Sequence, residues 1–483
     1  MSQNQVIQDK QPVALWLVFL TEMWERFSYY AMRSILILYM VYLLQMDKTG
    51  AANIYGTFTS LVYLSTLLGG FLADRYLGQR WSIILGSLLI ASGMFVMSVP
   101  TMGMLQLAMG LLILGNGFFK PNVTAIVGQL YEKDDPRRDG GFTIFYMSVN
   151  IGAFFGPLAV GYFAAQNNYK AAFWIAGIGM LIGLGTFLFG QKKYLAGKGL
   201  PPAEKPVFYK DSALWAVFLG ACVIALYMKG CHTAAWICGA ALVLGYAAYM
   251  KMRKQPETKN QAPLTTEEKH KIAVIAIMAF FTIFFWAAFE QAGAALNLFA
   301  YEYTNRVITL GSWSWEIPAN WFQSLNPLYI VIFAPLFSKL WINLAKKGKE
   351  PSTPAKFVVS LWLLAAGFAV MLLGAFALIG NAKISLFYLA FTYLFHTFGE
   401  LCISPVGKSM VTKLAPARYV SLLMGVWFLS NAAANKLAGV YSGYFQKISN
   451  VQFFLWLVVV PLLVSGILLM SMKGIKKWMH GVH

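Results

Sequence analysis

The sequence reads TEMWERFSYYAMR at residues 21–33, in the middle of a long apolar stretch. Charged side chains are costly within hydrocarbon, and those that occur inside membrane helices usually have a function. On a helix that turns by about 100° per residue, the ionisable positions of this stretch fall within roughly 100° of one another and share one face. We therefore expect this face to border a water-filled cavity. The four ionisable residues are Glu22, Glu25, Arg26 and Arg33.

The composition indicates a membrane protein. The 483 residues are 58% hydrophobic and 12% charged, with a mean hydropathy of +0.60, whereas about a quarter of the residues of a soluble domain are charged. Apolar runs of about 20 residues recur along the chain, and each is long enough to cross a hydrocarbon core of roughly 30 Å. The first run is too long for the apolar region of a signal peptide, so we expect it to stay in the membrane. The fold class is therefore an all-α polytopic membrane protein.

The apolar runs form a pattern of six, two and six, which predicts about 14 transmembrane helices. The first six lie at 12–43, 52–74, 80–99, 103–129, 140–164 and 170–190, the inserted pair at 212–229 and 232–252, and the last six at 270–300, 320–345, 355–380, 384–412, 419–446 and 450–473. We divide the chain into an N-terminal six-helix bundle (1–190), basic linkers with an inserted helical hairpin (191–268) and a C-terminal six-helix bundle (269–483).

The positive charges predict the orientation. If both termini are cytoplasmic, 26 of the 38 Lys and Arg residues lie in cytoplasmic segments and six lie in outer segments. This bias is typical of the positive-inside rule. The formal net charge of +19 therefore does not indicate nucleic-acid binding, since the basic residues form no continuous face with interleaved aromatic residues.

Three further charges stand alone in apolar surroundings: Lys120 in GNGFFKPNVT, Glu290 in FFWAAFEQAG and Glu400 in YLFHTFGELCISP. If the inserted pair is left out of the numbering, these residues lie on helices 4, 7 and 10. Like helix 1, each of these is the first helix of a unit of three. Two halves built from such units would place these helices around one central path. The bases lie in the N-terminal half, and the C-terminal half contributes only acids. A substrate with an anionic and a cationic end fits such a path, and so do salt bridges that join the halves.

Aromatic and amide side chains extend the candidate lining, although ordinary packing is an alternative for each aromatic residue. The step Asn326–Pro327 is predicted to bend or loosen the helix at 320–345, because proline removes a backbone hydrogen bond. The candidates are Tyr29, Tyr30, Tyr63, Trp286, Trp427, Asn150 and Asn326.

Nothing in the sequence predicts an enzyme, a cofactor or a metal site. The four cysteines have no metal-ligand or disulfide spacing. We find no paired nucleophile and base, and no phosphate-binding loop.

Several motifs resemble those of one family. EMWERFSYYAMR at 22–33 is similar to the helix 1 signature ExxER[FY]xYYGxR of the proton-coupled oligopeptide transporters, which belong to the major facilitator superfamily. FTIFYMSVNIGAF at 142–154 looks like that family's helix 5 signature, and GGFLADRYLGQR at 69–80 is similar to the superfamily's loop between helices 2 and 3. The resemblance spans nearly the whole chain and implies the major facilitator fold. The inserted pair is similar to the extra hairpin of bacterial members.

The resemblance also implies roles for individual residues. Proton coupling would use Glu22, Glu25, Arg26 and Glu290. Gating salt bridges would join Arg33 to Glu290 and Lys120 to Glu400. Arg26, Arg33 and Lys120 would attract a peptide carboxylate, and Glu400, Asn150 and Asn326 would hold the amino terminus. Side-chain pockets would be lined by Tyr29, Tyr30, Tyr63, Trp286 and Trp427.

The expected function is therefore proton-driven symport of di- and tripeptides into the cell by alternating access. The alternative is a proton-coupled carrier of another small anion such as nitrate. We expect a monomeric, multi-pass protein of a bacterial plasma membrane, with peptides, protons and membrane lipid as its partners.

Overall fold

The computed structural model describes residues 10–132, 135, 137–202, 264–378, 383–416 and 419–481. Within these ranges, eight helical stretches are long and apolar enough to cross a membrane. The chain is a multi-pass membrane protein, as predicted. The inserted pair expected at 212–229 and 232–252 lies outside the described residues.

The N-terminal helices lie close to the expected runs. Side-chain caps mark where some of these helices begin: the Asp47 side chain accepts a hydrogen bond from the Gly50 amide at 2.7 Å, and Asn168 accepts one from the Ala171 amide at 3.1 Å. Two of the helices end in a π turn, η1 (Tyr39–Leu43) and η2 (Ala73–Leu77). The helices are α1 (Val13–Leu38), α2 (Lys48–Leu72), α3 (Gly78–Met97), α4 (Met102–Gln129), α5 (Arg138–Ala165) and α6 (Tyr169–Tyr194).

The C-terminal helices differ from the expected runs in two places. The run at 270–300 is broken, because α9 ends at Phe289 and a 3₁₀ turn, η4 (Glu290–Gly293), precedes α10. The run at 320–345 begins as a 3₁₀ helix, η5, and becomes α-helical only at Leu325, next to the Asn326–Pro327 step. Pro327 itself lies in the first turn of α11, where its missing amide has no intrahelical partner to lose. The elements are α9 (Thr266–Phe289), α10 (Ala295–Tyr303), η5 (Ala319–Ser324), α11 (Leu325–Lys346), α12 (Thr353–Phe376), α13 (Phe387–Leu414), α14 (Val420–Ser442) and α15 (Asn450–Trp478).

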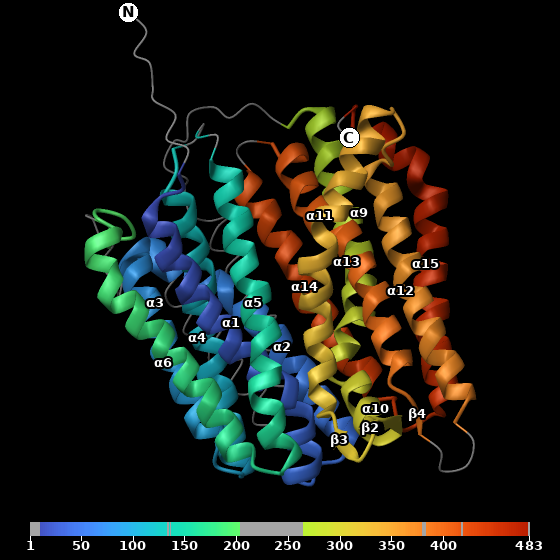
Figure 1. Ribbon diagram of the computed structural model, residues 1–483. Helices are drawn as coiled ribbons and strands as arrows, with labels where there is room; N and C mark the ends of the chain where they lie inside the picture. The colour runs from blue at the N-terminus through green and yellow to red at the C-terminus, as the bar shows by residue number, and fades with distance from the viewer. Residues whose placement is uncertain are drawn as a thin grey trace, which may run out of the picture.

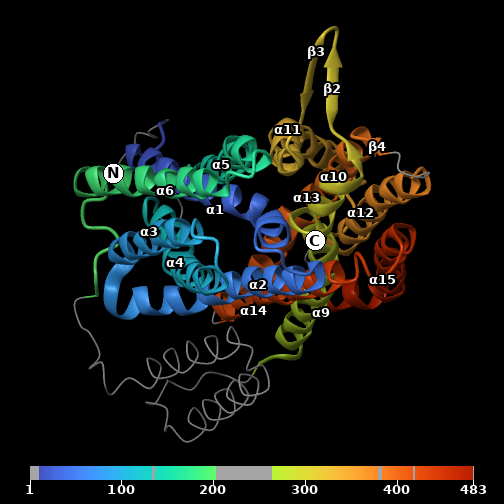
Figure 2. The same ribbon diagram turned by 90° about the horizontal axis from the view of Figure 1, so that it is seen from below.

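Short strands add to the helical fold in the segments between α10 and α13. β2 (Val307–Leu310) and β3 (Trp313–Glu316) form an antiparallel hairpin, which projects from the C-terminal helices in Figure 2. β1 (Thr304–Asn305) pairs in parallel with β4 (Ile384–Ser385). The Arg306 guanidinium and the Glu316 carboxylate, 2.7 Å apart, fasten the base of the hairpin.

Helices α1–α6 pack together and α9–α15 pack together, and the two groups lie side by side (Figure 1). We call them the N-terminal and C-terminal bundles. They meet where α2 runs along α14, and where α5 contacts η5 and α11. Helix α1 begins and α15 ends at the upper end of Figure 1. We call it the inner end, and the opposite end the outer end, because the positive-inside bias predicts that both termini are cytoplasmic. The domain boundaries near residues 190 and 269 stay a prediction.

Candidate functional site

The charged face of α1 is buried inside the protein. The Arg26 Nε atom lies 3.0 Å from Glu22 Oε1 and 2.5 Å from Glu25 Oε2. The three residues are 3%, 4% and 0% exposed, respectively. Two carboxylates thus share one guanidinium, which leaves one excess negative charge when both are ionised. A proton on either carboxylate balances the cluster, and charge balance matters because an unpaired buried charge costs several kcal/mol.

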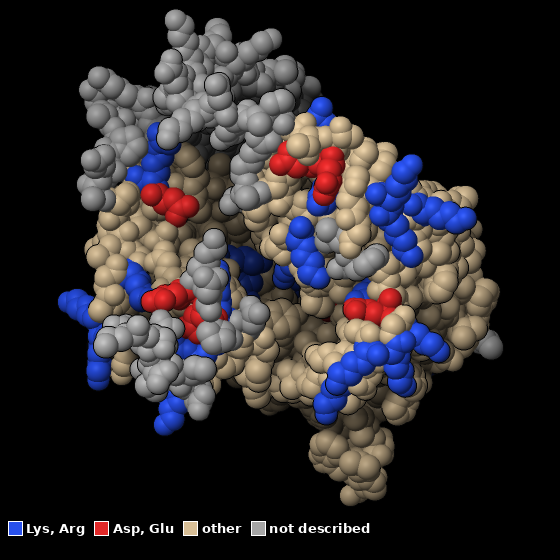
Figure 3. Space-filling model, turned by 90° about the horizontal axis from the view of Figure 1, so that it is seen from above, with Lys and Arg blue, Asp and Glu red and all other residues tan. Residues whose placement is uncertain are grey.

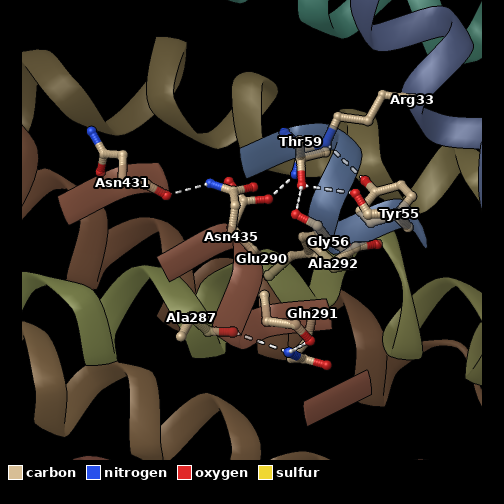
Figure 4. Close-up of polar contacts among 12 residues, drawn as sticks. Arg33, Tyr55, Gly56, Thr59, Ala287, Glu290, Gln291, Ala292, Asn431 and Asn435 are labelled. Carbon is tan, nitrogen blue, oxygen red and sulfur yellow. Dashed lines mark hydrogen bonds and ion pairs between the residues drawn. The ribbon is translucent and has the colours of Figure 1, made fainter. Parts of the chain in front are cut away.

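Arg33, two turns further along α1, joins the two bundles. Its guanidinium forms an ion pair with Glu290, the first residue of η4, and its Nε donates a hydrogen bond to the Tyr55 hydroxyl of α2 at 2.8 Å. Figure 4 shows Arg33 and Tyr55 facing each other, with Glu290 among the same group of polar side chains. The break between α9 and α10 occurs at this residue. Arg33 and Glu290 are 9% and 6% exposed, respectively, so the pair is buried.

Hydrogen bonds between the bundles surround this ion pair toward the outer end. Asn297 Nδ2 of α10 donates to the Ser34 carbonyl at 2.6 Å, and Asn320 Nδ2 of η5 donates to Ser34 Oγ at 3.0 Å. Ser324 Oγ donates to the Phe154 carbonyl of α5 at 2.8 Å. Sequence analysis missed these residues, since buried amides and hydroxyls are common in membrane helices and carry no charge.

The crossing of α2 and α14 completes this closure. A Cβ atom on Gly56 would lie 2.5 Å from the Gly439 Cα, so the two backbones touch. Lys436 Nζ of α14 donates to Thr57 Oγ1 at 2.7 Å. Nearer the outer surface, Glu302 accepts hydrogen bonds from Lys48 and Tyr42. These contacts and the ion pair of Arg33 and Glu290 are called the outer closure below.

The inner end is arranged differently. Asn326 Nδ2 donates to Glu400 Oε2 at 2.8 Å and to Thr397 Oγ1 at 3.0 Å. Lys120 Nζ lies 4.5 Å from the centre of the Tyr63 ring. In the part of the chain that the structure describes, no ion pair joins Lys120 to Glu400. Figure 3 shows a hollow between the two bundles at this end, bordered by Lys and Arg side chains.

Sequence analysis passed over one base at the inner end. Lys408 of α13 interacts electrostatically with Lys120, Tyr63 and Glu400. The signal was present, since Lys408 lies inside the apolar run expected at 384–412. A lysine near the end of such a run can also reach the membrane surface.

The predicted tyrosines lie beside the bases. The Arg26 guanidinium lies 5.5 Å from the centre of the Tyr29 ring, and that of Arg33 lies 5.9 Å from the centre of the Tyr30 ring. Lys120 likewise has the Tyr63 ring as its neighbour, so each of the three predicted bases of the site lies beside an aromatic ring. Such contacts stabilise a cation without neutralising it.

Three other predicted lining residues have local partners. Asn150 Nδ2 donates to the Tyr146 carbonyl of its own helix at 3.1 Å. Trp427 is 4% exposed, and its ring packs over Gly407. Trp286 is half-buried, with its ring centre 5.1 Å from that of Phe289. Of these three, Trp286 is the most accessible.

Two helical bundles that enclose charged side chains define a secondary transporter of the major facilitator class. A family model described as "PTR2: POT family" matches residues 80–457. An uncharacterized transporter of Bacillus subtilis, YclF, is 38% identical over 98% of this chain and 96% of its own. A di-/tripeptide transporter of Lactococcus lactis subsp. cremoris is 33% identical, covering 98% of this chain and 97% of its own.

A solved structure gives the same result. The crystal structure of a POT family transporter in complex with a thioalcohol-conjugated peptide superposes with a TM-score of 0.82 at 33% identity, covering 96% of each chain. The chain therefore belongs to the POT family, a family of transporters, and is a multi-pass protein of the plasma membrane.

Proposed function

We propose that this chain imports di- and tripeptides together with protons by alternating access. The observation that carries the proposal is an asymmetry of charge pairing. At the outer end Arg33 and Glu290 form an ion pair between the bundles, whereas at the inner end Lys120 and Glu400 form none in the described structure. A protein closed at one end and hollowed at the other is what alternating access requires. The names of the relatives and the peptide in the solved structure support peptides as the substrate.

A peptide has a charged group at each end, and the cleft has a partner for each. Lys120, with Arg26 and Arg33, attracts the carboxylate from the N-terminal bundle. Glu400, positioned by Asn326 at 2.8 Å, holds the amino group from the C-terminal bundle. Asn150 of α5 would contribute to the same contact from the N-terminal bundle. In this binding mode the protein recognises the two charged ends of the peptide. The peptide side chains contact aromatic residues, which accommodate many shapes; these are Tyr29, Tyr30, Tyr63, Trp286 and Trp427.

Proton coupling follows from the acids of α1 and α9. Glu22 and Glu25 share the Arg26 guanidinium, so one proton fits this cluster. Protonation of Glu290 releases Arg33 and weakens the outer closure. The driving force is about 2.3 kcal/mol per proton for each 100 mV of inside-negative potential and about 1.4 kcal/mol per unit of pH gradient.

The inner end closes when Lys120 and Glu400 approach each other. These residues lie on α4 and α13, in opposite bundles. A bridge between them would seal the cleft when the outer closure opens, and a peptide whose two ends occupy them separately would delay the bridge. The two pairs thus work in alternation.

Nitrate, the alternative, lacks the cationic end that Glu400 would hold. The Lactococcus lactis relative is named a di-/tripeptide transporter and the solved structure contains a conjugated peptide, which leaves the nitrate alternative without support. We infer a monomer that works without a cofactor or a catalytic step.

The test is uptake of radiolabelled dialanine by purified full-length protein in sealed proteoliposomes. Uptake should exceed equilibrium when the outside is made acidic and should stop at equilibrium when no gradient is imposed. Excess unlabelled dialanine should compete, and excess nitrate should not. Failure of the liposomes to accumulate dialanine under any gradient would exclude the proposed function.

A further inference from the structure

Lys408 is a base of the cleft to which the proposed mechanism gives no role. It lies eight residues after Glu400 on α13, which corresponds to roughly 12 Å of helix rise. At this spacing Lys408 forms no ion pair with Glu400 in the described structure, yet the two side chains are close enough to interact electrostatically. Lys408 interacts in the same way with Lys120 and Tyr63 across the cleft. The ammonium group therefore points into the hollow between the bundles.

The side chain is surrounded by protein but reached by water. Lys408 is exposed, although its electrostatic neighbours belong to α2, α4 and α13. In the described structure it forms no hydrogen bond and no ion pair. Lys120 has an aromatic neighbour and Glu400 has an amide neighbour, whereas Lys408 is a water-accessible cation without a hydrogen-bonding partner among the described residues.

The charges of the cleft suggest what Lys408 binds. Among the described residues, the contacts above bring three acids and three bases together inside the outer closure, and this set of groups is neutral when all are ionised. One coupled proton gives it a charge of +1. A dipeptide with neutral side chains adds no net charge, whereas one with an acidic side chain adds −1 and restores neutrality. The groups are Glu22, Glu25, Glu400, Arg26, Lys120 and Lys408.

Neutrality matters most when the cleft closes around its cargo. Water then leaves, the local dielectric constant falls, and an unbalanced charge costs more than it does in the open state. Without Lys408 the proton-loaded cleft would match a dipeptide of zero net charge. With Lys408 it matches a dipeptide of net charge −1.

We propose that Lys408 forms a subsite for the side-chain carboxylate of acidic peptides, so that the transporter favours dipeptides with Asp or Glu over neutral ones. This inference rests on the proposed function and names the substrate class of the same cleft. Lys120 and Glu400 bind the two ends of the peptide, and Lys408, nearer the inner end on α13, binds the additional carboxylate.

The test compares Ala-Glu with Ala-Gln, which have the same shape and differ in charge. Each peptide competes with labelled dialanine for proton-driven uptake into proteoliposomes at one fixed pH. For the wild-type protein, Ala-Glu should inhibit at about threefold to tenfold lower concentration than Ala-Gln, the range expected between an exposed and a buried charge contact. Ala-Lys should inhibit least. This comparison needs no variant.

Variants then assign the preference to one residue. Lys408→Gln should abolish the difference between Ala-Glu and Ala-Gln, and Lys408→Arg should keep it. Lys473→Gln, which removes an exposed positive charge at the inner end of α15, should also keep it. A wild-type protein that does not prefer Ala-Glu overturns the inference, as does a preference that survives Lys408→Gln.

Two other outcomes distinguish failure of the Lys408 subsite from failure of the proposed function. If Lys408→Gln weakens inhibition by Ala-Glu and Ala-Gln equally, Lys408 only positions Glu400, and the subsite does not exist. If the wild-type protein takes up no dialanine, the proposed function itself fails. Uptake of dialanine without the charge preference refutes the subsite alone.

Discussion

Replacing Glu290 with Gln should shift the protein toward a state that is open at the outer end. The glutamine keeps the shape of the side chain and an oxygen that accepts a hydrogen bond from Arg33, but it removes the negative charge. A hydrogen bond to a charged group contributes about 1.5–3 kcal/mol. Since about 1.4 kcal/mol corresponds to a factor of ten, the ratio of outward-open to outward-closed protein should rise by roughly 10-fold to 150-fold.

The other contacts of the outer closure should keep the rise in the ratio of outward-open to outward-closed protein near the lower end of this range. Asn297, Asn320 and Ser324 still donate to the N-terminal bundle at 2.6–3.0 Å, and none of these bonds depends on the charge of Glu290. Each neutral hydrogen bond contributes about 1 kcal/mol. We therefore expect a shift of about 10-fold, with the protein still able to close.

Distances between spin labels measure this shift directly. Gln166 follows α5 and Lys447 follows α14, both are exposed, and they belong to opposite bundles at the outer end. In a variant whose native cysteines are replaced by serine, labels at these two positions should show a larger long-distance population after Glu290→Gln. Glu316→Gln is the matched control, because its partner Arg306 lies in the same bundle. Identical distance distributions for wild type and Glu290→Gln would refute the gating role.

Three further predictions concern the coupling cluster, the helix crossing and the inner base. Glu25→Gln should abolish proton-driven accumulation of dialanine and retain some peptide exchange, because Arg26 then has one carboxylate, Glu22, and no proton to gain; normal uphill uptake would contradict this. Gly439→Val should push α2 and α14 apart, because a Cβ on residue 439 would lie 2.7 Å from the Gly56 Cα. A cysteine introduced in the outer closure should then react faster with a thiol reagent added from outside, and unchanged labelling would contradict this. Lys120→Gln should raise the KM for dialanine by about tenfold, the value of one charge-assisted contact, and an unchanged KM would remove Lys120 from carboxylate binding.

The charged residues of the cleft were predictable because their chemistry is rare in a membrane helix. Glu22, Glu25 and Arg26 share a face and interact as expected. Arg33 and Glu290, 257 residues apart in sequence, required the assumption that helices 1 and 7 face a common path. The geometry of their ion pair agrees with that assumption, while its role in gating stays a prediction.

The outer closure was not predictable in the same way. Its contacts use a backbone carbonyl, amides and hydroxyls, for example Asn320 with Ser34 and Ser324 with Phe154. Such groups are common along these helices, and their partners depend on how two bundles meet. The break of the helix at Glu290 also has no sequence signal, because proline is absent there and glycine comes only at Gly293.

Helix α1 physically connects the cluster of Glu22, Glu25 and Arg26, which is the proposed proton site, with the outer closure. Arg26 and Arg33 are seven residues apart, about 10 Å along one uninterrupted helix. Helix α5 is bound closely to α1, since a Cβ on Gly156 would lie 2.5 Å from the Phe27 carbonyl oxygen. We therefore expect the two helices to move together and to carry with them the carbonyl of Phe154, which accepts the hydrogen bond from Ser324. In the proposed mechanism, protonation of a carboxylate beside Arg26 that shifts α1 would strain the contacts of α1 with η4 and those of α5 with η5, so the opening of the outer end would need no separate relay.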